Sequence, residues 1–158
     1  MVADPLCEGW PVIDEMGKTN KRFSMRLAEG WEDQTVHLFV GPAERGMNHH
    51  LTIAVDDIPL AETAQDYAEY RVEQFLDTLP AAEVLKEEPL ALGEDLDAYE
   101  VVIKFVPSEA GPRFRRLVFV LHENTAFTFA ADFTKVTRNT LGAQMIEMIK
   151  TFRPEAGA

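Results

Sequence analysis

The chain has 158 residues, 46% of them apolar, and a formal net charge of −12. This length favours a single domain whose core needs no disulfide or metal to fold, and the single cysteine, Cys7, excludes an intramolecular disulfide. Nucleic acid and anionic membrane surfaces are disfavoured as partners, because both repel a negatively charged protein.

The first 20 residues show no steady hydrophobic period and contain Pro5, Gly9, Pro11 and Gly17. They predict an irregular N-terminal extension over residues 1–20. The segment lacks the basic start and the continuous apolar run of a signal peptide. No stretch of the chain approaches the roughly 20 apolar residues of a membrane helix. We therefore expect a cytoplasmic protein that does not insert into a membrane.

Alternating polar and apolar residues predict three strands before the first helix. They cover residues 22–27, 35–40 and 50–55. Gly41-Pro42 is expected to end the second strand, and the second and third strands are expected to pair antiparallel. In that pairing, His37 and His50 would point to the same side of the sheet.

A helix is predicted to begin at Thr63, whose spacing to Asp66 is that of a capping box, and to end at Pro80. A second helix is predicted over residues 137–152. The chain between the helices predicts strands at residues 82–92, 99–105, 114–121 and 125–131. Their short connections favour an antiparallel sheet, so the predicted fold class is α+β with two main helices. Residues 21–154 form the predicted single domain, and 155–158 a frayed tail.

Catalytic motifs are not evident in the sequence. No glycine-rich phosphate loop is present, and the two serines, Ser24 and Ser108, have no histidine or acid at a telling spacing. His37 and His50 could hold a metal ion only if a carboxylate joined them, and a metal-dependent enzyme built on them is the weakest alternative. We expect no enzymatic activity, no metal and no cofactor.

One segment resembles a known family. Residues 29–40, EGWEDQTVHLFV, resemble the opening motif of the DcrB-like family, a Trp-x-Asp-x-Ser/Thr element followed by alternating hydrophobic residues. The similarity continues through the strand at 51–56 and the helix with Tyr67 to Thr-Phe-Arg-Pro at 151–154, and so spans residues 22–154. It implies a PsbP-like α+β sandwich.

Two branches of that family have different implications. One consists of exported, lipid-anchored envelope proteins, whose signal and lipobox cysteine are not found in this sequence. The other consists of the Eag chaperones, small acidic proteins encoded beside type VI secretion effectors, which this chain resembles in size and charge. This resemblance implies a homodimeric cytosolic chaperone that shields the apolar N-terminal helices of PAAR- or Rhs-type effectors.

The resemblance also implies a groove for such a helix between two strands and the first helix. The partner-binding positions are then Val36, Leu38, His50, Ala54, Arg71, Phe75 and Leu79, to which we add Arg116 on the long strand. Ordinary core packing is the alternative for Val36, Leu38, Phe75 and Leu79. The alternative function is a structural or regulatory module that binds a folded partner. An exposed apolar groove favours the chaperone, and a sheet covered by a helix on each face favours the module.

Overall fold

The computed structural model describes residues 23–93 and 95–155. Residues 34–152 form one compact unit, and residues 23–33 with 153–155 belong to another. Residues 23–33 contain no strand, only a turn at 29–30. The strand predicted at 22–27 is therefore wrong for its described residues, because alternation makes a strand only where a neighbouring strand supplies hydrogen bonds. The extension predicted at 1–20 lies outside the described residues.

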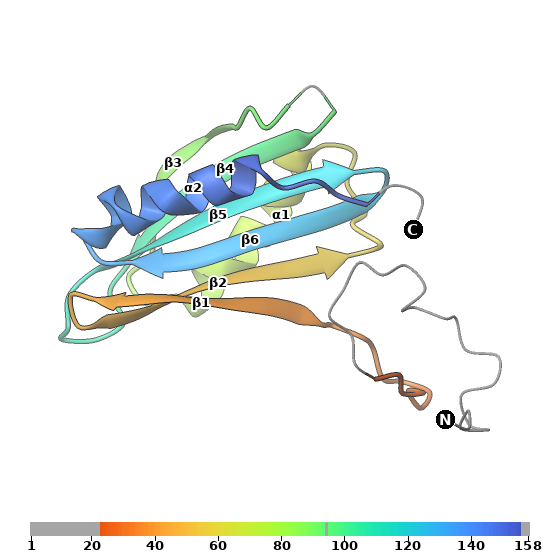
Figure 1. The fold of residues 1–158 in the computed structure, drawn as a ribbon, viewed down its shortest axis with the longest axis horizontal. Helices are drawn as coiled ribbons and strands as arrows, with labels where there is room; N and C mark the ends of the chain where they lie inside the picture. The colour runs from red at the N-terminus through yellow and green to blue at the C-terminus, as the bar shows by residue number, and fades with distance from the viewer. Residues whose placement is uncertain (1–22, 94, 156–158) are drawn as a thin grey trace. The chain divides into compact units, whose positions relative to one another are not determined.

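Six antiparallel strands form one sheet in the order β1-β2-β6-β5-β4-β3 (Figure 1). Their bounds are Val36–Glu44 for β1, Met47–Asp56 for β2, Glu83–Pro89 for β3, Asp97–Phe105 for β4, Arg113–His122 for β5 and Thr125–Phe133 for β6. The chain therefore has the predicted antiparallel α+β fold.

The two helices lie on opposite faces of this sheet (Figure 1). Helix α1 (Ala64–Thr78) lies on the face where it contacts β4 and β5, and α2 (Leu141–Lys150) lies on the other face against β6. The 3-10 helix η3 (Thr137–Asn139) precedes α2 and occupies the start of the predicted second helix. Thr63 caps α1 as predicted, because its hydroxyl accepts a hydrogen bond from the Asp66 N–H at 3.0 Å. Among the described residues, no helix is long and apolar enough to cross a membrane.

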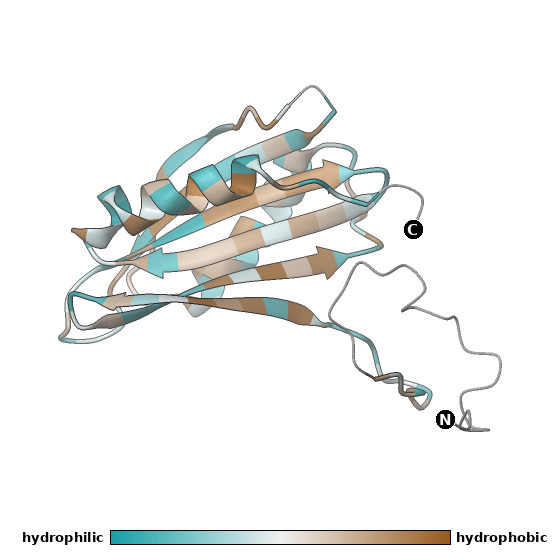
Figure 2. Ribbon diagram, in the orientation of Figure 1, coloured by the Kyte–Doolittle hydropathy of each residue, from teal (hydrophilic) through white to brown (hydrophobic). Residues whose placement is uncertain are grey.

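Strand alternation divides the hydrophobic core into one cluster on each face of the sheet. On the α1 face, helix and strand residues pack together, namely Tyr67, Ala68, Val72, Val101, Ile103, Leu117, Phe119 and Ala126. The cluster on the α2 face includes Val118, Val120, Phe129, Leu141, Met145 and Ile149. Figure 2 shows the apolar residues concentrated along the strands, including the first half of β1, which no helix covers.

Strand β1 is longer than predicted, because it continues through Gly41 and Pro42. The pairing register with β2 shifts between Val40 and Ala43, which marks a β-bulge. Pro42 is tolerated there because β1 is an edge strand, so an N–H on its outer side needs no partner. Beyond the bulge, Arg45 and Gly46 have positive φ angles of 54° and 72° and form the tight turn into β2.

Candidate functional site

Helix α1 covers only part of its sheet face and leaves a hollow of about 320 Å³ beside it, over β1, β2 and β6. We call this hollow the groove. Its lining includes Val36 from β1, His50, Thr52 and Ala54 from β2, Arg71 and Phe75 from α1, Arg115 from β5, and Ala130 and Asp132 from β6. Five of the eight partner-binding residues predicted from the sequence are in this set.

The register of the first two strands explains why predicted residues from both come together. Val36 pairs with Ala54, and Leu38 pairs with Thr52. Directly paired residues in an antiparallel sheet point to the same side, so Leu38 continues the groove face along β1. The side chains of Val36 and Leu38 are 50% and 58% exposed. Neither belongs to a core cluster of the described residues.

Phe75 and Leu79, both predicted to bind the partner, lie in different surroundings. Phe75 lines the groove, and its ring lies between two guanidinium groups, 5.6 Å from that of Arg71 and 5.5 Å from that of Arg115. Leu79 follows the helix as its C-cap and packs against the core cluster of the α1 face. For Leu79, core packing is therefore the interpretation that the contacts favour.

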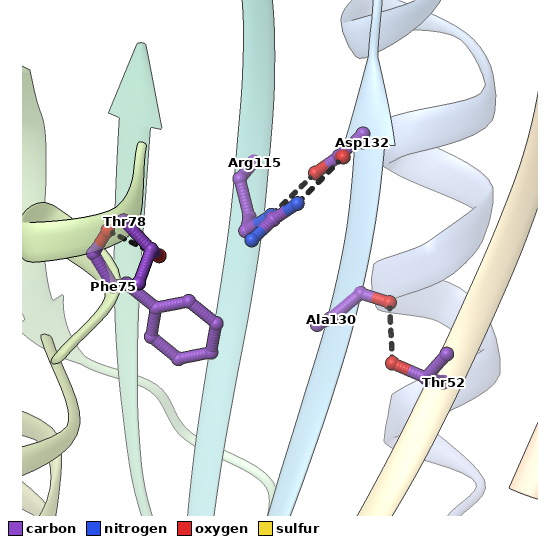
Figure 3. A network of polar contacts seen from close by, with 6 residues as sticks. All are labelled: Thr52, Phe75, Thr78, Arg115, Ala130 and Asp132. Atoms are coloured by element: carbon purple, nitrogen blue, oxygen red, sulfur yellow. Dashed lines mark hydrogen bonds and ion pairs between the residues drawn. The ribbon is translucent and has the colours of Figure 1, made fainter. Parts of the chain in front are cut away.

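An ion pair forms part of the groove floor (Figure 3). Arg115 donates to both carboxylate oxygens of Asp132, from Nε at 2.7 Å and from Nη2 at 2.9 Å. The two residues are paired across β5 and β6, and this bidentate geometry is the strong form of such a pair. Sequence reasoning missed them, because opposite charges 17 residues apart become a signal only once the strand register is known.

Arg71 differs from Arg115 in having no acidic partner. Its guanidinium forms no ion pair with any carboxylate in residues 23–93 and 95–155, and its buried Nε has no hydrogen-bond partner there. The guanidinium lies 5.6 Å from the centre of the Phe75 ring. The groove therefore combines apolar side chains, one balanced ion pair, one unbalanced cation and a set of further polar side chains, namely Asn48, His50, Thr52 and Thr128.

The structure places Arg116 on the opposite face of the sheet, away from the groove. Its Nη1 donates to the Gly142 carbonyl oxygen at 3.0 Å. Its Nε lies 2.8 Å from Glu100 Oε2, a contact whose direction is outside hydrogen-bond geometry, so we treat it as an ion pair. Arg116 borders a second hollow, of about 230 Å³, together with Lys86 and residues of η3.

The buried Glu100 is the centre of an ion cluster on that face. It is 1% exposed, and Lys86 Nζ donates to its Oε1 at 2.7 Å and to Glu88 Oε1 at 3.0 Å. The hydrogen bond to Glu100 is the largest of the effects that raise the pKa of Lys86. The cluster joins β3, β4 and β5, and Arg116 extends it to α2.

The histidines do not come together as predicted. His37 pairs with Ile53, whereas His50 pairs with Val40. His37 and Val40 are three residues apart on one strand, so His37 and His50 point to opposite faces, and the prediction that they share a side is wrong. The ring of His49 on β2 contacts the Pro42 carbonyl oxygen on β1 and the Thr137 hydroxyl of η3, each at 2.9 Å. Within the described part of the chain, no three metal-binding side chains cluster.

Comparison with known proteins gives a family match and several structural likenesses. A family model described as DcrB matches residues 24–150. PA94 of Pseudomonas aeruginosa, a protein of unknown function proposed to be a regulator, is 16% identical with a TM-score of 0.66, and the match covers 83% of this chain and 90% of that one. The cyanobacterial PsbP of Synechocystis, CyanoP, is 12% identical with a TM-score of 0.53, over 83% of this chain and 99% of that one.

A third solved structure is less similar. LpqN, involved in cell envelope biogenesis of Mycobacterium tuberculosis, is 12% identical with a TM-score of 0.48, over 77% of this chain and 84% of that one. None of the curated proteins matches the sequence. The likeness to CyanoP supports the PsbP-like α+β fold that the sequence predicts.

Proposed function

The chain belongs to the DcrB family, and from this premise we propose that it is a non-catalytic, cytosolic chaperone or adaptor. Its partner in this proposal is an apolar N-terminal helix of a type VI secretion effector of the PAAR or Rhs type. The observation that carries the proposal is the groove, an apolar hollow beside α1 that no element of residues 34–152 fills. The role requires neither a metal nor a cofactor.

The groove lining offers apolar side chains, among them Val36, Ala54 and Phe75, against which a helix could pack. An apolar helix exposed to water needs a cover before it reaches a membrane. Packing one side of it between β1 and α1 is the helix-in-groove mode of recognition. The exposed Val40, 73% accessible, extends the apolar surface of Val36 and Leu38 along β1. Burying this surface contributes about 25 cal/mol for each Å² removed from water.

We propose further that the working unit is a homodimer. One groove covers one side of a helix about 10 Å wide and leaves the other side in water. All nine residues of β1 are exposed, and β1 is an edge strand of the sheet. An uncovered edge with apolar side chains favours association with a second chain. Two copies could then enclose the helix from both sides.

A structural or regulatory module remains the alternative function, and the placement of the two helices favours it. The sheet carries a helix on each face, the arrangement that we associate with binding a folded partner through polar surface. PA94, the structurally similar protein from Pseudomonas aeruginosa, is also proposed to be a regulator. A module of this kind would not depend on the apolar residues of the groove.

The test is capture of an effector segment by variants with a polar groove. The N-terminal segment of a PAAR- or Rhs-type effector encoded beside this chain is co-expressed with the wild type, Val36→Gln or Leu38→Gln. We expect each variant to retain at most about a fifth of the affinity, because a buried amide without partners costs about 1–3 kcal/mol. Melting temperatures should stay within about 2 °C of the wild type, since both side chains are half-exposed.

Val136→Gln is the matched control. Val136 is 48% exposed and does not line the groove, so this change should alter neither capture nor melting. Unchanged capture by both groove variants, with unchanged melting, would contradict the chaperone proposal and favour the regulatory module.

A further inference from the structure

The groove contains one positive charge that nothing in the described chain balances. Arg115 is neutralised by Asp132 through two hydrogen bonds of 2.7 and 2.9 Å. Arg71 lies in the same lining and forms no ion pair with any carboxylate of residues 23–93 and 95–155. In a protein with a net charge of −12, an unbalanced cation in an apolar hollow is a local exception to the overall charge.

The Nε–H of Arg71 is also without a hydrogen bond. The atom is buried, so bulk water does not reach it, and no acceptor among the described residues meets it. A buried donor without an acceptor carries an unfavourable desolvation free energy, and a charged donor carries more than a neutral one. Phe75, one helical turn after Arg71, supports the guanidinium through its ring but supplies no oxygen acceptor.

A bound helix would complete the desolvation of this cation. A purely apolar helix laid in the groove would strip the remaining water from the guanidinium and offer nothing in return. A helix with a carboxylate at the right position would satisfy the donor and balance the charge, which are the contributions of a charge-assisted hydrogen bond. Arg71 would therefore select among apolar helices by penalising those without an acidic side chain.

We propose that the helix held in the groove carries an aspartate or glutamate that pairs with Arg71. This inference rests on the proposed function and adds a chemical requirement to its partner. It distinguishes this protein from a chaperone that binds any apolar segment, because the bound helix must then carry one acidic residue on its otherwise apolar surface.

The test uses apolar helical segments of defined sequence. A segment of about 20 leucine and alanine residues, the length of a membrane helix, is fused to a soluble carrier protein. Its central residue is glutamate, glutamine or leucine, and each is placed at four successive positions so that every side of the helix is sampled. At the best position, we expect the glutamate segment to bind the full-length protein at least about tenfold more tightly than the leucine segment.

The decisive variant is Arg71→Met, which keeps an unbranched apolar stem beside Phe75 and removes the guanidinium. It should bind the three segments with equal affinity, and it should bind the leucine segment more tightly than the wild type does. Arg138→Met is the matched control, because Arg138 also lies over an aromatic ring, that of Phe114 at 4.2 Å, but outside the groove. The control should keep the full preference for glutamate.

Each other outcome is informative. Equal binding of all three segments to the wild type, or equal behaviour of the two methionine variants, would overturn the inference and leave the proposed function standing. A glutamine segment that binds as tightly as the glutamate segment would overturn the requirement for a charge. If no segment binds at any position, the proposed function fails and the inference fails with it.

Discussion

At the level of single residues, Glu100 is the feature that the sequence conceals most completely. It lies between Tyr99 and Val101 in an alternating strand, a position where a charged side chain is expected to face water. In the structure the strand is covered on both sides, and the carboxylate is met by Lys86 and Arg116 instead. Alternation alone cannot reveal this, because it does not show whether the polar face of a strand is also covered.

We expect Glu100→Gln to lower the free energy of unfolding by about 2 kcal/mol at neutral pH. Removing one member of a fully buried pair costs roughly 3–5 kcal/mol, and the loss here is smaller because water partly reaches both cations. Urea denaturation measures the change. Glu88→Gln is the control, because Glu88 contacts the same lysine from an exposed position and should shift stability by no more than about 0.5 kcal/mol. Equal losses for the two variants would show that burial is not the cause.

At the level of elements, hydrogen bonds to two strands fix the N-terminal end of α1. The Tyr67 hydroxyl donates to Asp56 Oδ2 on β2 at 3.0 Å. The Ala64 N–H donates to Asp97 Oδ2 on β4 at 2.7 Å. Because the start of the helix is held in this way, its next two turns, with Arg71 and Phe75, form one wall of the groove.

The buried hydrogen bond from Tyr67 to Asp56 should affect the pH dependence of the free energy of unfolding. Burial, and then the hydrogen bond to Asp56, raise the pKa of Tyr67 from 10.0 to about 12. The pKa is thus higher in the folded state than in the unfolded state. The contribution of Tyr67 to stability is therefore complete below pH 10 and is lost as the pH rises towards 12.

Urea denaturation at about pH 9 and about pH 11.5 measures this loss. Between these two values, we expect the wild type to lose more stability than Tyr67→Phe, which has no phenol to ionise at this position. Tyr70→Phe, at an exposed site on the same helix, should lose as much as the wild type. A parallel decline in all three proteins would contradict the role of the buried phenol.

The sequence predicted most strands and both helices, because their hydrophobic periods are regular. It did not predict where β1 ends, since Gly41 and Pro42 usually interrupt a strand and are accommodated here by a bulge on an edge. The error about His37 and His50 has a related cause, because the faces that paired residues share depend on the strand register. The β-bulge between Val40 and Ala43 shifts that register by one residue and so turns His37 and His50 to opposite faces.

At the level of the whole molecule, the fold class could be predicted from the sequence. Which side chains lie on the α1 face of the sheet and which on the α2 face could not. Strand β5 is apolar on both sides from Leu117 onward, so this part of its sequence does not show which helix covers which side. Arg116, a predicted groove residue, lies on the α2 face. Val36, His50, Ala54, Arg71 and Phe75 do line one hollow, but this grouping was implied by family resemblance and not by the hydrophobic pattern.

We expect the purified protein to be a homodimer in solution, with a mass about twice 17.8 kDa by light scattering coupled to size exclusion. Val40→Lys should shift it towards the monomer, because a lysine on an edge strand opposes pairing with another chain. Val136→Lys, at an exposed site away from β1, should leave the dimer intact. A wild type that is monomeric at tens of micromolar would contradict the enclosure of a helix by two grooves.

The exposure of β1 on both faces also affects the colloidal behaviour of the protein. The strand presents a strip of exposed apolar side chains, with Val36, Leu38 and Val40 on one face and Phe39 on the other. The molecule that carries this strip has a net charge of −12. Mutual repulsion keeps such molecules apart at low ionic strength, but salt at physiological concentration shortens its range to about 8 Å. Raising the salt removes the repulsion and leaves the strip unchanged. Solubility without a partner is therefore set by the ionic medium rather than by the stability of the fold.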